Sequence, residues 1–504
     1  MEWNFVIYSS TILLPILMFI LYTRKPNNKR LPPGPPGLPL FGNIFQLGTS
    51  PHKTIAELKH KYGPIVWLKM GSVNTMVILS ADIANEFFKN HDLSFIDRRV
   101  FDANRSKNYY KGSLALAPYG VYWRVMRRIC TVEMFVNKRI NETVSIRRKC
   151  VDNMLLWIEE EANSMQGRSN GIQVAQYIFL ASFNMIGNLM LSRDLVDPES
   201  KEGSDFFNIM KRMMELGGQP NISDLLPRLR WFDLQGIRRK MDRDLGKALD
   251  IATTFMKERI EEHKAGKQKR KDFLDVLLEF EGSKNEPAKL SELEINIFTM
   301  EMFLAGSETS STTIEWAMAE LLRNPETMMK VRNEISSVVG SNMKFEESDI
   351  DKLSYLQAVI KETLRLHPPV PFLVPRRAIQ DTNFMGYLIP KYTQVFVNVW
   401  AIGRDKEYWE EPLVFKPERF LGSKIDYKGQ HFEFIPFGAG RRICPGLPLG
   451  QRMMHFMLGS LLHKFDWEPA FSTNPNYTID MTDVIGSVMR KREPLKVVPI
   501  KRLV

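Results

Sequence analysis

The feature that most restricts this chain is the loop at residues 434–446, which reads Phe-Ile-Pro-Phe-Gly-Ala-Gly-Arg-Arg-Ile-Cys-Pro-Gly. Glycines and prolines at this density cannot form regular helix or strand, so the loop is predicted to be a tight turn held by its backbone. It presents Cys444 just before an apolar stretch, residues 447–462, whose spacing is helical. A thiol at a helix N-terminus faces the positive end of the helix dipole, and Arg441 and Arg442 add positive charge. The position is therefore predicted to favour the thiolate.

A lone thiolate on a glycine-rich loop is suited to the axial ligation of a haem iron, although a single cysteine taken alone is more often a small buried hydrophobic residue. The neighbouring residues decide between the two. Phe437, Gly440, Arg442, Cys444 and Gly446 match without exception the haem-binding signature Phe-x-x-Gly-x-Arg-x-Cys-x-Gly. The chain therefore resembles the cytochrome P-450 superfamily. The resemblance implies haem b as the cofactor, Cys444 as the metal ligand, and Phe437 and Arg442 at the haem.

Composition bounds the remaining possibilities. At 504 residues with 44% hydrophobic residues, the chain can bury a large core, as several domains or as one large helical domain. The net charge is +11, but no run of basic residues interleaved with aromatics indicates a nucleic-acid surface. A basic face toward anionic lipid or an acidic partner fits better. The three cysteines are too few for a disulfide framework, and no CxxC pair suggests zinc, so a reducing compartment is expected.

The N-terminal segment predicts a membrane anchor. Residues 5–22 are apolar and uncharged, and basic residues follow them between positions 24 and 30, whereas only Glu2 precedes them. This pattern indicates an uncleaved signal anchor at residues 1–24 with the rest of the chain in the cytosol. A buried core helix is the alternative, against which the extreme N-terminal position argues. Residues 25–43 are predicted to be a basic, proline-rich linker, which also resembles the proline-rich hinge of microsomal family members.

The rest of the chain predicts a single mostly helical domain, residues 44–504, with a smaller sheet region. Residues 66–70 and 75–79 alternate like paired strands around a Gly-Ser turn. Helical patterns dominate from about residue 81 to 365, and short strands with proline-bounded turns follow. The fold class is therefore predicted to be mainly α with a smaller β region, contributed by both the N- and C-terminal parts. The resemblance implies the cytochrome P-450 fold.

Residues 289–323 form the longest helical pattern, with a possible capping box of Ser291 and Glu294 at its start. Its middle contains Gly306, Glu308 and Thr309, which suit a buried helix interior poorly. An exposed polar turn would explain them. The alternative is a site at which Gly306 lets a flat ligand approach the backbone. The segment resembles the family's oxygen-activation motif, which implies that Glu308 and Thr309 are catalytic and deliver protons.

A second set of charged residues is predicted to be structural. Glu362 and Arg365 lie three apart near the end of a helix expected at residues 354–366 and stopped by Pro368. Alone, this would be an ordinary surface ion pair. With Arg419 the residues match the family's Glu-x-x-Arg and Pro-Glu-Arg-Phe elements. The resemblance implies a triad that locks the core beneath the cysteine loop.

A haem needs cationic and hydrogen-bonding partners for its two propionates. Trp123 and Arg127 lie four apart on one helical face and match the family's Trp-x-x-x-Arg. The resemblance places Arg376 and Arg442 at the propionates as well, and Arg98 is a further candidate. Any one of these arginines taken alone is better explained by solvation, and it is the joint pattern that favours a role for Trp123, Arg127 and Arg442.

The resemblance as a whole implies a microsomal monooxygenase in the endoplasmic reticulum membrane, which takes NADPH-derived electrons from a flavoprotein reductase and uses O2. Residues 89–95 are similar to a plant family that includes monoterpenoid oxidases acting on geraniol and iridoids. Phe303, Phe372, Leu373 and Ile485 are expected to give an apolar pocket, suited to a small terpenoid. Alkaloid or phenolic substrates, a haem-thiolate isomerase or dehydratase that needs no reductase, and a haem sensor without turnover remain alternatives.

Overall fold

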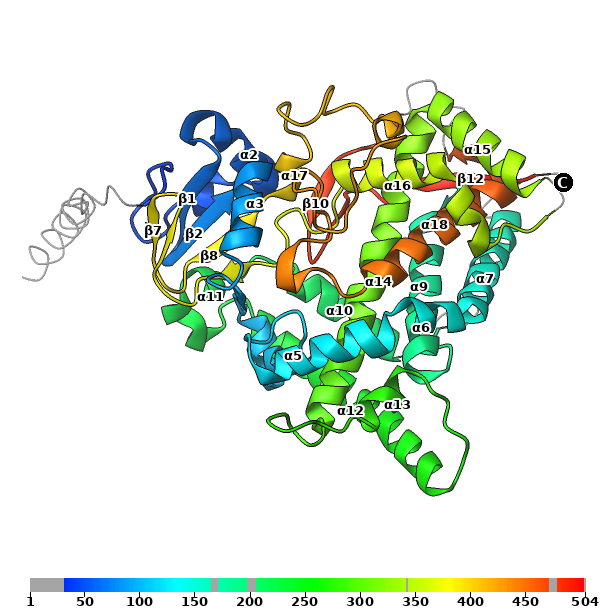
Figure 1. Ribbon diagram of the computed structural model, residues 1–504, viewed down its shortest axis with the longest axis horizontal. Coiled ribbons are helices and arrows are strands. Elements are labelled where there is room, and N and C mark those ends of the chain that lie inside the picture. The colour runs from blue at the N-terminus through cyan, green and yellow to red at the C-terminus, as the bar shows by residue number, and fades with distance from the viewer. Residues whose placement is uncertain (1–30, 165–170, 197–204, 341–342, 471–477, 503–504) are drawn as a thin grey trace, which may run out of the picture.

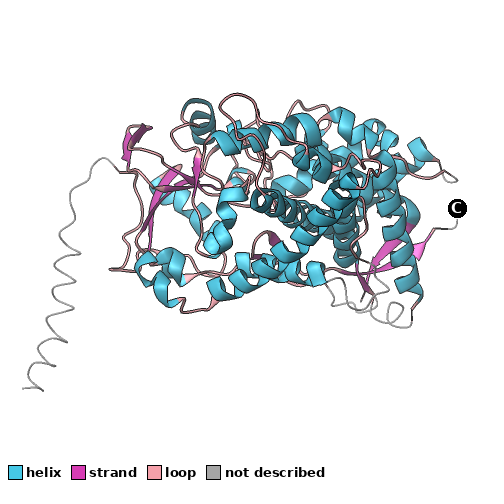
Figure 2. Cartoon of the chain, turned by 90° about the horizontal axis from the view of Figure 1, so that it is seen from below, coloured by secondary structure: helices cyan, strands magenta, loops and turns pink. Residues whose placement is uncertain are grey.

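The computed structural model describes residues 31–164, 171–196, 205–340, 343–470 and 478–502. The predicted anchor at residues 1–24 and the first part of the linker lie outside the described residues. A large helical part occupies most of the protein, and strands gather mainly at one end of it (Figures 1 and 2). The helices are α2 (Pro51–Tyr62), α3 (Ala81–Asn90), α4 (Tyr109–Gly112), α5 (Val121–Arg128), α6 (Asn137–Glu142), α7 (Val144–Asn163), α9 (Val174–Leu191), α10 (Asp205–Gly217), α11 (Ile222–Leu225), α12 (Ile237–Lys264), α13 (Phe273–Leu278), α14 (Glu292–Arg323), α15 (Pro325–Val339), α16 (Ser354–Leu366), α17 (Val399–Ile402) and α18 (Leu447–Lys464).

The largest sheet joins segments that are far apart in the sequence, in the order β1-β2-β8-β5-β3. Its strands pair antiparallel except for β2 and β8, which run parallel. A smaller sheet, β4-β12-β9, lies near the C-terminus, and β6-β7 and β10-β11 form two-stranded sheets. The strands are β1 (Ile65–Met70), β2 (Val73–Ile78), β3 (Asp97–Arg98), β4 (Ile172–Gln173), β5 (Arg376–Arg377), β6 (Thr382–Phe384), β7 (Tyr387–Ile389), β8 (Gln394–Val397), β9 (Phe465–Pro469), β10 (Asp483–Ile485), β11 (Met489–Lys491) and β12 (Lys496–Lys501). The prediction of a small sheet region built from both parts of the chain is confirmed.

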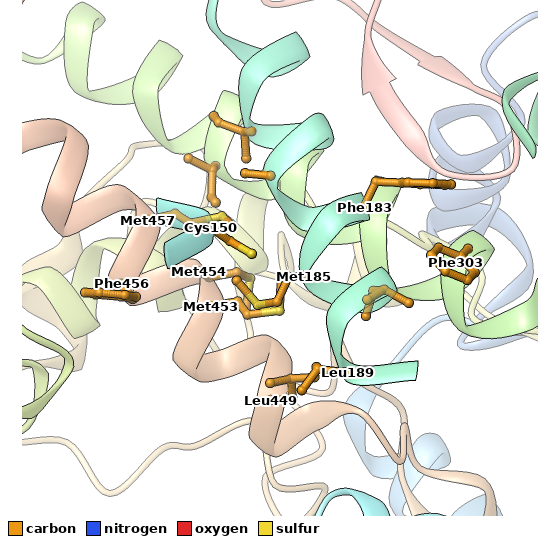
Figure 3. Packing of buried hydrophobic residues seen from close by; sticks show 14 of the residues in the cluster. Cys150, Phe183, Met185, Leu189, Phe303, Leu449, Met453, Met454, Phe456 and Met457 are labelled. Atoms are coloured by element: carbon orange, nitrogen blue, oxygen red, sulfur yellow. The ribbon is translucent and has the colours of Figure 1, made fainter. Parts of the chain in front are cut away.

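The core is organised around α14, which runs through the middle of the helical part (Figure 1) and packs against α9, α12, α16 and α18. Figure 3 shows flexible methionine side chains filling the space between α9 and α18, with Met185 facing Met453 and Met454. Among the described helices, α9 is long and apolar enough to cross a membrane, but 78% of it is buried inside the protein. Its apolar surface is therefore used for packing in the core.

Local sequence signals set the ends of the principal helices. The Ser291 hydroxyl accepts a hydrogen bond from the Glu294 N–H, and the Glu294 carboxylate accepts one from the Ser291 N–H, so the predicted capping box is confirmed. The predicted helix at residues 354–366 is α16 with the same bounds. The residues that look like an exposed polar turn, around Gly306, lie inside the continuous helix α14.

Candidate active site

The cysteine loop has the tight backbone that its glycines predict. The Cys444 N–H donates to the Phe437 carbonyl at 3.0 Å, which closes the loop. Gly438 and Gly440 adopt φ values of 73° and 70°, a left-handed conformation that favours glycine. A Cβ at Gly440 would also lie 2.7 Å from Asp92 Oδ1. Glycine at position 440 is thus required both by the backbone angle and by the close approach of a carboxylate.

The loop presents the sulfur of Cys444 just before α18, where the N–H groups of Gly446 and Leu447 donate to it. These donors and the nearby Arg127 favour the thiolate, but burial raises the pKa of the Cys444 thiol above its ordinary value because the protein encloses the sulfur. The predicted helix-terminus effect is therefore present, yet the desolvation of the thiolate outweighs it in the protein alone. A metal cation at the sulfur would reverse this balance, because a coordinating thiol is deprotonated.

A cavity of about 320 Å³ lies between the cysteine loop and α14. Cys444 and Phe437 line it on the side of the loop, and Ala305, Gly306 and Thr309 line it on the side of α14. The other lining side chains are mostly apolar and come from several elements, among them α5, α9, α18, β8 and the segments around residues 114 and 370. The structure thus places one thiol and one helix face on a common, largely apolar space.

Three buried arginines, Arg98, Arg376 and Arg442, also line this cavity. Arg442 donates to the Ala117 carbonyl at 2.7 Å, and Arg376 Nη2 lies 3.1 Å from Asp92 Oδ1. Arg376 Nη1 and Arg442 Nε and Nη1 have no hydrogen-bond partner among the described residues. Burial, together with the positive charge of Arg376, lowers the pKa of Arg442 to about 9. This arginine cluster therefore has unused donors and an excess of positive charge.

The predicted pair Trp123 and Arg127 lies on α5 beside the same cavity. The Trp123 ring stacks under the Arg442 guanidinium, whose central carbon is 4.6 Å from the ring centroid. The Trp123 Nε1–H donates to the Leu114 carbonyl at 3.1 Å. Arg127 Nη1 donates to the Ile443 carbonyl at 2.5 Å. Helix α5 is thereby attached to the cysteine loop next to the thiol.

The two predicted catalytic residues on α14 occupy different surroundings. Thr309 lines the cavity, and its hydroxyl donates to the Ala305 carbonyl at 2.8 Å. Glu308 is not among the lining residues. Its Oε2 accepts a hydrogen bond from the Ser487 hydroxyl at 2.8 Å, and burial raises its pKa. The structure therefore brings Thr309, but not the Glu308 carboxylate, to the cavity.

Some pocket expectations are corrected. Phe372 and Leu373 line the cavity, but Phe303 and Ile485 are not among its lining residues. Phe303 packs against Phe183 in the core instead, with ring centroids 4.7 Å apart (Figure 3), because its turn of α14 faces α9. A Cβ at Gly306 would lie 2.8 Å from the Cδ1 atom of Ile186. This glycine lets α14 pack closely on α9, in addition to lining the cavity.

Sequence reasoning missed two carboxylates at this site, Asp92 and Glu301. Asp92 contacts Arg376 and also accepts a hydrogen bond from the Arg441 N–H at 3.1 Å. Glu301, on α14, is buried at the edge of the cavity. Neither has a local sequence signal, because their partners are more than 180 residues away in the chain.

The residues of the cavity fit a haem. Unsatisfied donors on buried cations are costly, and the donors of Arg376 and Arg442 match what two anionic propionates require. The largely apolar walls suit the porphyrin ring, and the thiol of Cys444 at the cavity wall is a ligand that haem iron accepts in proteins. The expectation from the sequence is therefore consistent with the donors and the shape that the fold assembles.

Comparison with known proteins gives a consistent result. Residues 32–498 match the family model described as "Cytochrome P450". The chain is 60% identical to "Cytochrome P450 76A2" of Solanum melongena, over 99% of both chains. It is 52% identical to the "Iridoid oxidase" of Catharanthus roseus, over 99% of this chain and 97% of the relative. A zebrafish cytochrome P450 in a structure with progesterone superposes with a TM-score of 0.74 at 26% identity, over 89% of this chain and 99% of that one.

These relatives span the whole described protein, including the cysteine loop, α14 and the arginine cluster. The fold, the thiol at the apolar cavity and the family match agree with one another. The chain belongs to the cytochrome P-450 family and is a haem-dependent monooxygenase.

Proposed function

We propose that Cys444 is the axial ligand of the haem and that the enzyme oxidises a small apolar plant metabolite, most specifically a monoterpenoid or iridoid. The observation that supports this most directly is the position of the Cys444 thiol, at the cavity wall across from the Thr309 turn of α14. When bound, haem supplies the activation of dioxygen with electrons that originate from NADPH. Trp123, Arg127, Arg376 and Arg442 bind and orient the haem, and Phe437 packs beside it.

The proton-handling residues are proposed to be Thr309 and Glu308. The Thr309 hydroxyl lies at the cavity and is held against the helix by its hydrogen bond to Ala305, so it is placed to hold or pass a proton there. Glu308 lies behind it toward Ser487. Because burial raises the pKa of Glu308, its proton-carrying form is more accessible near neutral pH than that of an exposed glutamate. Glu308 would then resupply the proton that Thr309 passes on.

The substrate class is inferred from the walls of the cavity. Leu114, Met302, Val370, Phe372 and Leu373 supply apolar contacts. The charged groups at the cavity are engaged by the protein or suited to the propionates, which leaves little to bind a charged substrate. The 52% sequence identity to an iridoid oxidase supports a terpenoid substrate. An alkaloid or a phenolic compound is the alternative substrate class.

The decisive experiment is expression in microsomes with a plant reductase, followed by mass spectrometry of products from geraniol and a panel of iridoids, phenolics and alkaloids. Oxidised geraniol or iridoid products that require both NADPH and O2 are expected, and a Cys444→Ala protein should form none. Product formation without NADPH would indicate an isomerase or dehydratase instead. Oxidation of phenolics alone would overturn the terpenoid assignment but not the monooxygenase chemistry.

The electron donor is proposed to be the membrane-bound NADPH-dependent reductase, docked through acidic residues. The support is the basic surface next to the thiol: Arg124, Arg128 and Arg441 are exposed beside the junction of α5 with the cysteine loop. Opposite charges across such an interface accelerate association and are screened by salt. Electron transfer from the reductase should therefore slow as ionic strength rises. A salt-independent rate would argue against this docking surface.

We also propose attachment to the endoplasmic reticulum membrane through residues 1–24, with the catalytic domain in the cytosol. Exposed apolar side chains gather around the β1–β2 turn, where the Gly71 N–H donates to the Phe41 carbonyl and the Ser72 N–H to the Leu225 carbonyl, each at 3.0 Å. They are Leu38, Leu40, Phe41, Phe45, Trp231, Phe232 and Leu234. Such a patch close to the linker is suited to lipid contact. Removal of residues 1–24 should weaken membrane binding in flotation assays, and unchanged binding would argue against the anchor.

A further inference from the structure

The buried carboxylate of Glu301 makes an unusual contact across the cavity edge. Glu301 lies on α14, two turns before Thr309, and is only 5% exposed. Its Oε1 accepts hydrogen bonds from the Ser113 hydroxyl and, at 3.2 Å, from the Ala115 N–H. Its Oε2 accepts one from the Leu114 N–H at 2.6 Å. One side chain thus satisfies the donors of three consecutive residues that belong to no helix or strand.

These residues belong to a wall segment, residues 113–117, whose carbonyls accept hydrogen bonds from other side chains. The Leu114 carbonyl accepts from Trp123 and the Ala115 carbonyl accepts from Arg98, each at 3.1 Å. The Ala117 carbonyl accepts from Arg442. Leu114 and Ala115 themselves line the cavity. The wall segment is therefore held by hydrogen bonds from two directions along its backbone: its carbonyls bond to Trp123 and to the arginine cluster, and its N–H groups bond to a single carboxylate on α14.

Most of the acceptor capacity of the carboxylate is used by this wall segment. Three donors converge on its two oxygens, and all three belong to the wall segment. Backbone N–H groups can only donate, which requires an acceptor at both oxygens and favours the ionised form. Burial raises the pKa of Glu301, and the three donors and the positive charge of Arg442 only partly oppose that shift. An amide in its place would direct its own N–H groups at those of the wall.

We propose that Glu301 is a positioning residue: by fixing the wall segment against α14, it sets the shape of the cavity and hence which carbon of the substrate is oxidised. This inference rests on the proposed function, because it assigns a specificity role within the same site. Glu301 acts through Leu114 and Ala115, which contact the substrate space, and does not itself transfer a proton or bind the substrate.

The test compares Glu301→Gln with a matched control, Glu315→Gln, in the full-length haem-loaded enzyme. Glu315 is also a buried glutamate on α14, and it accepts a hydrogen bond from the Leu495 N–H at 2.9 Å, but it does not line the cavity. Hydrogen–deuterium exchange should accelerate about 10- to 100-fold at the Leu114 and Ala115 amides in Glu301→Gln, as expected when a buried hydrogen-bonded acceptor is lost. In Glu315→Gln, exchange there should change less than about twofold.

Two further measurements connect the wall to specificity. The affinity ratio of the bulky iron ligand 4-phenylimidazole to imidazole reports the shape of the cavity without turnover. It should change by about fivefold or more in Glu301→Gln, since about 1 kcal/mol of altered contact gives this factor. With geraniol as the test substrate, the distribution of products among the oxidised positions should change. The absorption spectrum of the reduced, carbon monoxide-bound enzyme, which reports thiolate ligation, should be unchanged. The control should preserve all three properties.

A second variant covers the case in which Glu301→Gln does not fold. Ser113→Ala removes one donor to Glu301 and the acceptor of the Leu116 N–H, and it leaves α14 unchanged. It should change the exchange, the ligand ratio and the products in the same direction, but by less. Unchanged exchange in both variants would overturn the proposal. So would altered products with unchanged exchange, which would show direct substrate contact by Glu301. If the wild-type enzyme leaves geraniol unchanged, the terpenoid assignment fails, and the exchange and ligand-ratio results still decide the role of Glu301.

Discussion

Two of the ionic clusters in the described part of the chain both contain arginines and a carboxylate, but they differ in completeness. In the first, Glu362 accepts hydrogen bonds from Arg365 at 2.7 Å and from Arg419 at 3.0 Å. The remaining donors of Arg365 reach backbone carbonyls, including that of Pro412 at 2.7 Å. In the second, the arginine cluster of Arg98, Arg376 and Arg442, donors are left unused.

This difference distinguishes a cluster that stabilises the fold from a cluster that binds a ligand. A buried ion pair whose every donor is matched by the protein holds the fold, and removing one partner strands the other. The free donors of a buried cationic group are satisfied only when an anion binds to them. The triad of Glu362, Arg365 and Arg419 therefore acts in the protein alone, whereas the arginine cluster acts together with the haem propionates.

The largest effect should follow disruption of the complete cluster. Glu362→Gln leaves the buried Arg365 and the partly buried Arg419 without their counter-charge, and we expect it to cost about 3–5 kcal/mol of unfolding free energy. Chemical denaturation of the haem-loaded protein measures this loss. The control is Glu142→Gln, which removes an exposed pair with Arg139 and should cost less than about 0.5 kcal/mol. Equal losses in both variants would contradict the structural role of Glu362.

The incomplete cluster should respond differently to the presence of haem. Arg442→Met removes the unsatisfied Nε and Nη1 donors and the single hydrogen bond to the Ala117 carbonyl, so the unfolding free energy of the haem-free protein should change by only about 1 kcal/mol. In the loaded protein the propionate contact is lost, and haem should dissociate about 10- to 100-fold faster. Transfer of haem to apomyoglobin measures the rate. A loss of unfolding free energy of the same size with and without haem would show that the arginine cluster stabilises the fold in the same way as the Glu362 cluster.

A smaller effect is expected when charge is kept and geometry is changed. Arg376→Lys retains a cation for Asp92, but a single ammonium cannot reproduce the planar set of donors. Haem should dissociate about 3- to 10-fold faster, because one hydrogen bond is lost while the charge stays. The same transfer assay applies. Dissociation as fast as in Arg442→Met would mean that the direction of the donors, and not the charge, dominates the binding.

The smallest effect is expected at Arg441, which borders the arginine cluster but is half exposed. Its Nη1 lies 3.3 Å from Asp92 Oδ2, and its backbone N–H holds the same carboxylate. Arg441→Ala keeps the backbone contact, so stability should fall by less than about 1 kcal/mol. Haem dissociation should change less than about twofold. A large increase would place Arg441 among the haem-binding residues.

The features that could be predicted from the sequence are those that depend on local patterns of residues. The capping box at Ser291, the helix over residues 354–366 and the turn of the cysteine loop follow from hydrogen-bonding side chains, periodicity and glycine or proline content. The family signature supplies the roles of Cys444, Arg442 and the Glu362 triad as hypotheses, and the structure places all of these residues in compatible surroundings.

What the sequence does not predict depends on contacts between distant segments. Asp92 approaches Gly440 across 348 residues, and no local pattern distinguishes it from a surface aspartate. Phe303 directly follows the cavity residue Met302, yet the packing of α14 on α9 directs it into the core. The direction of the Cys444 pKa shift is set by enclosure, which only the complete fold reveals.

The parallel pairing of β2 with β8 has a consequence for how the protein is made. Thr75 is paired with Gln394, so the N-terminal strands leave the ribosome long before their partner exists. Until then, one edge of the β1–β2 hairpin is unprotected and prone to wrong association. Nascent chains that end before residue 394 should depend on chaperones, and acquisition of the native sheet should coincide with the last fifth of translation.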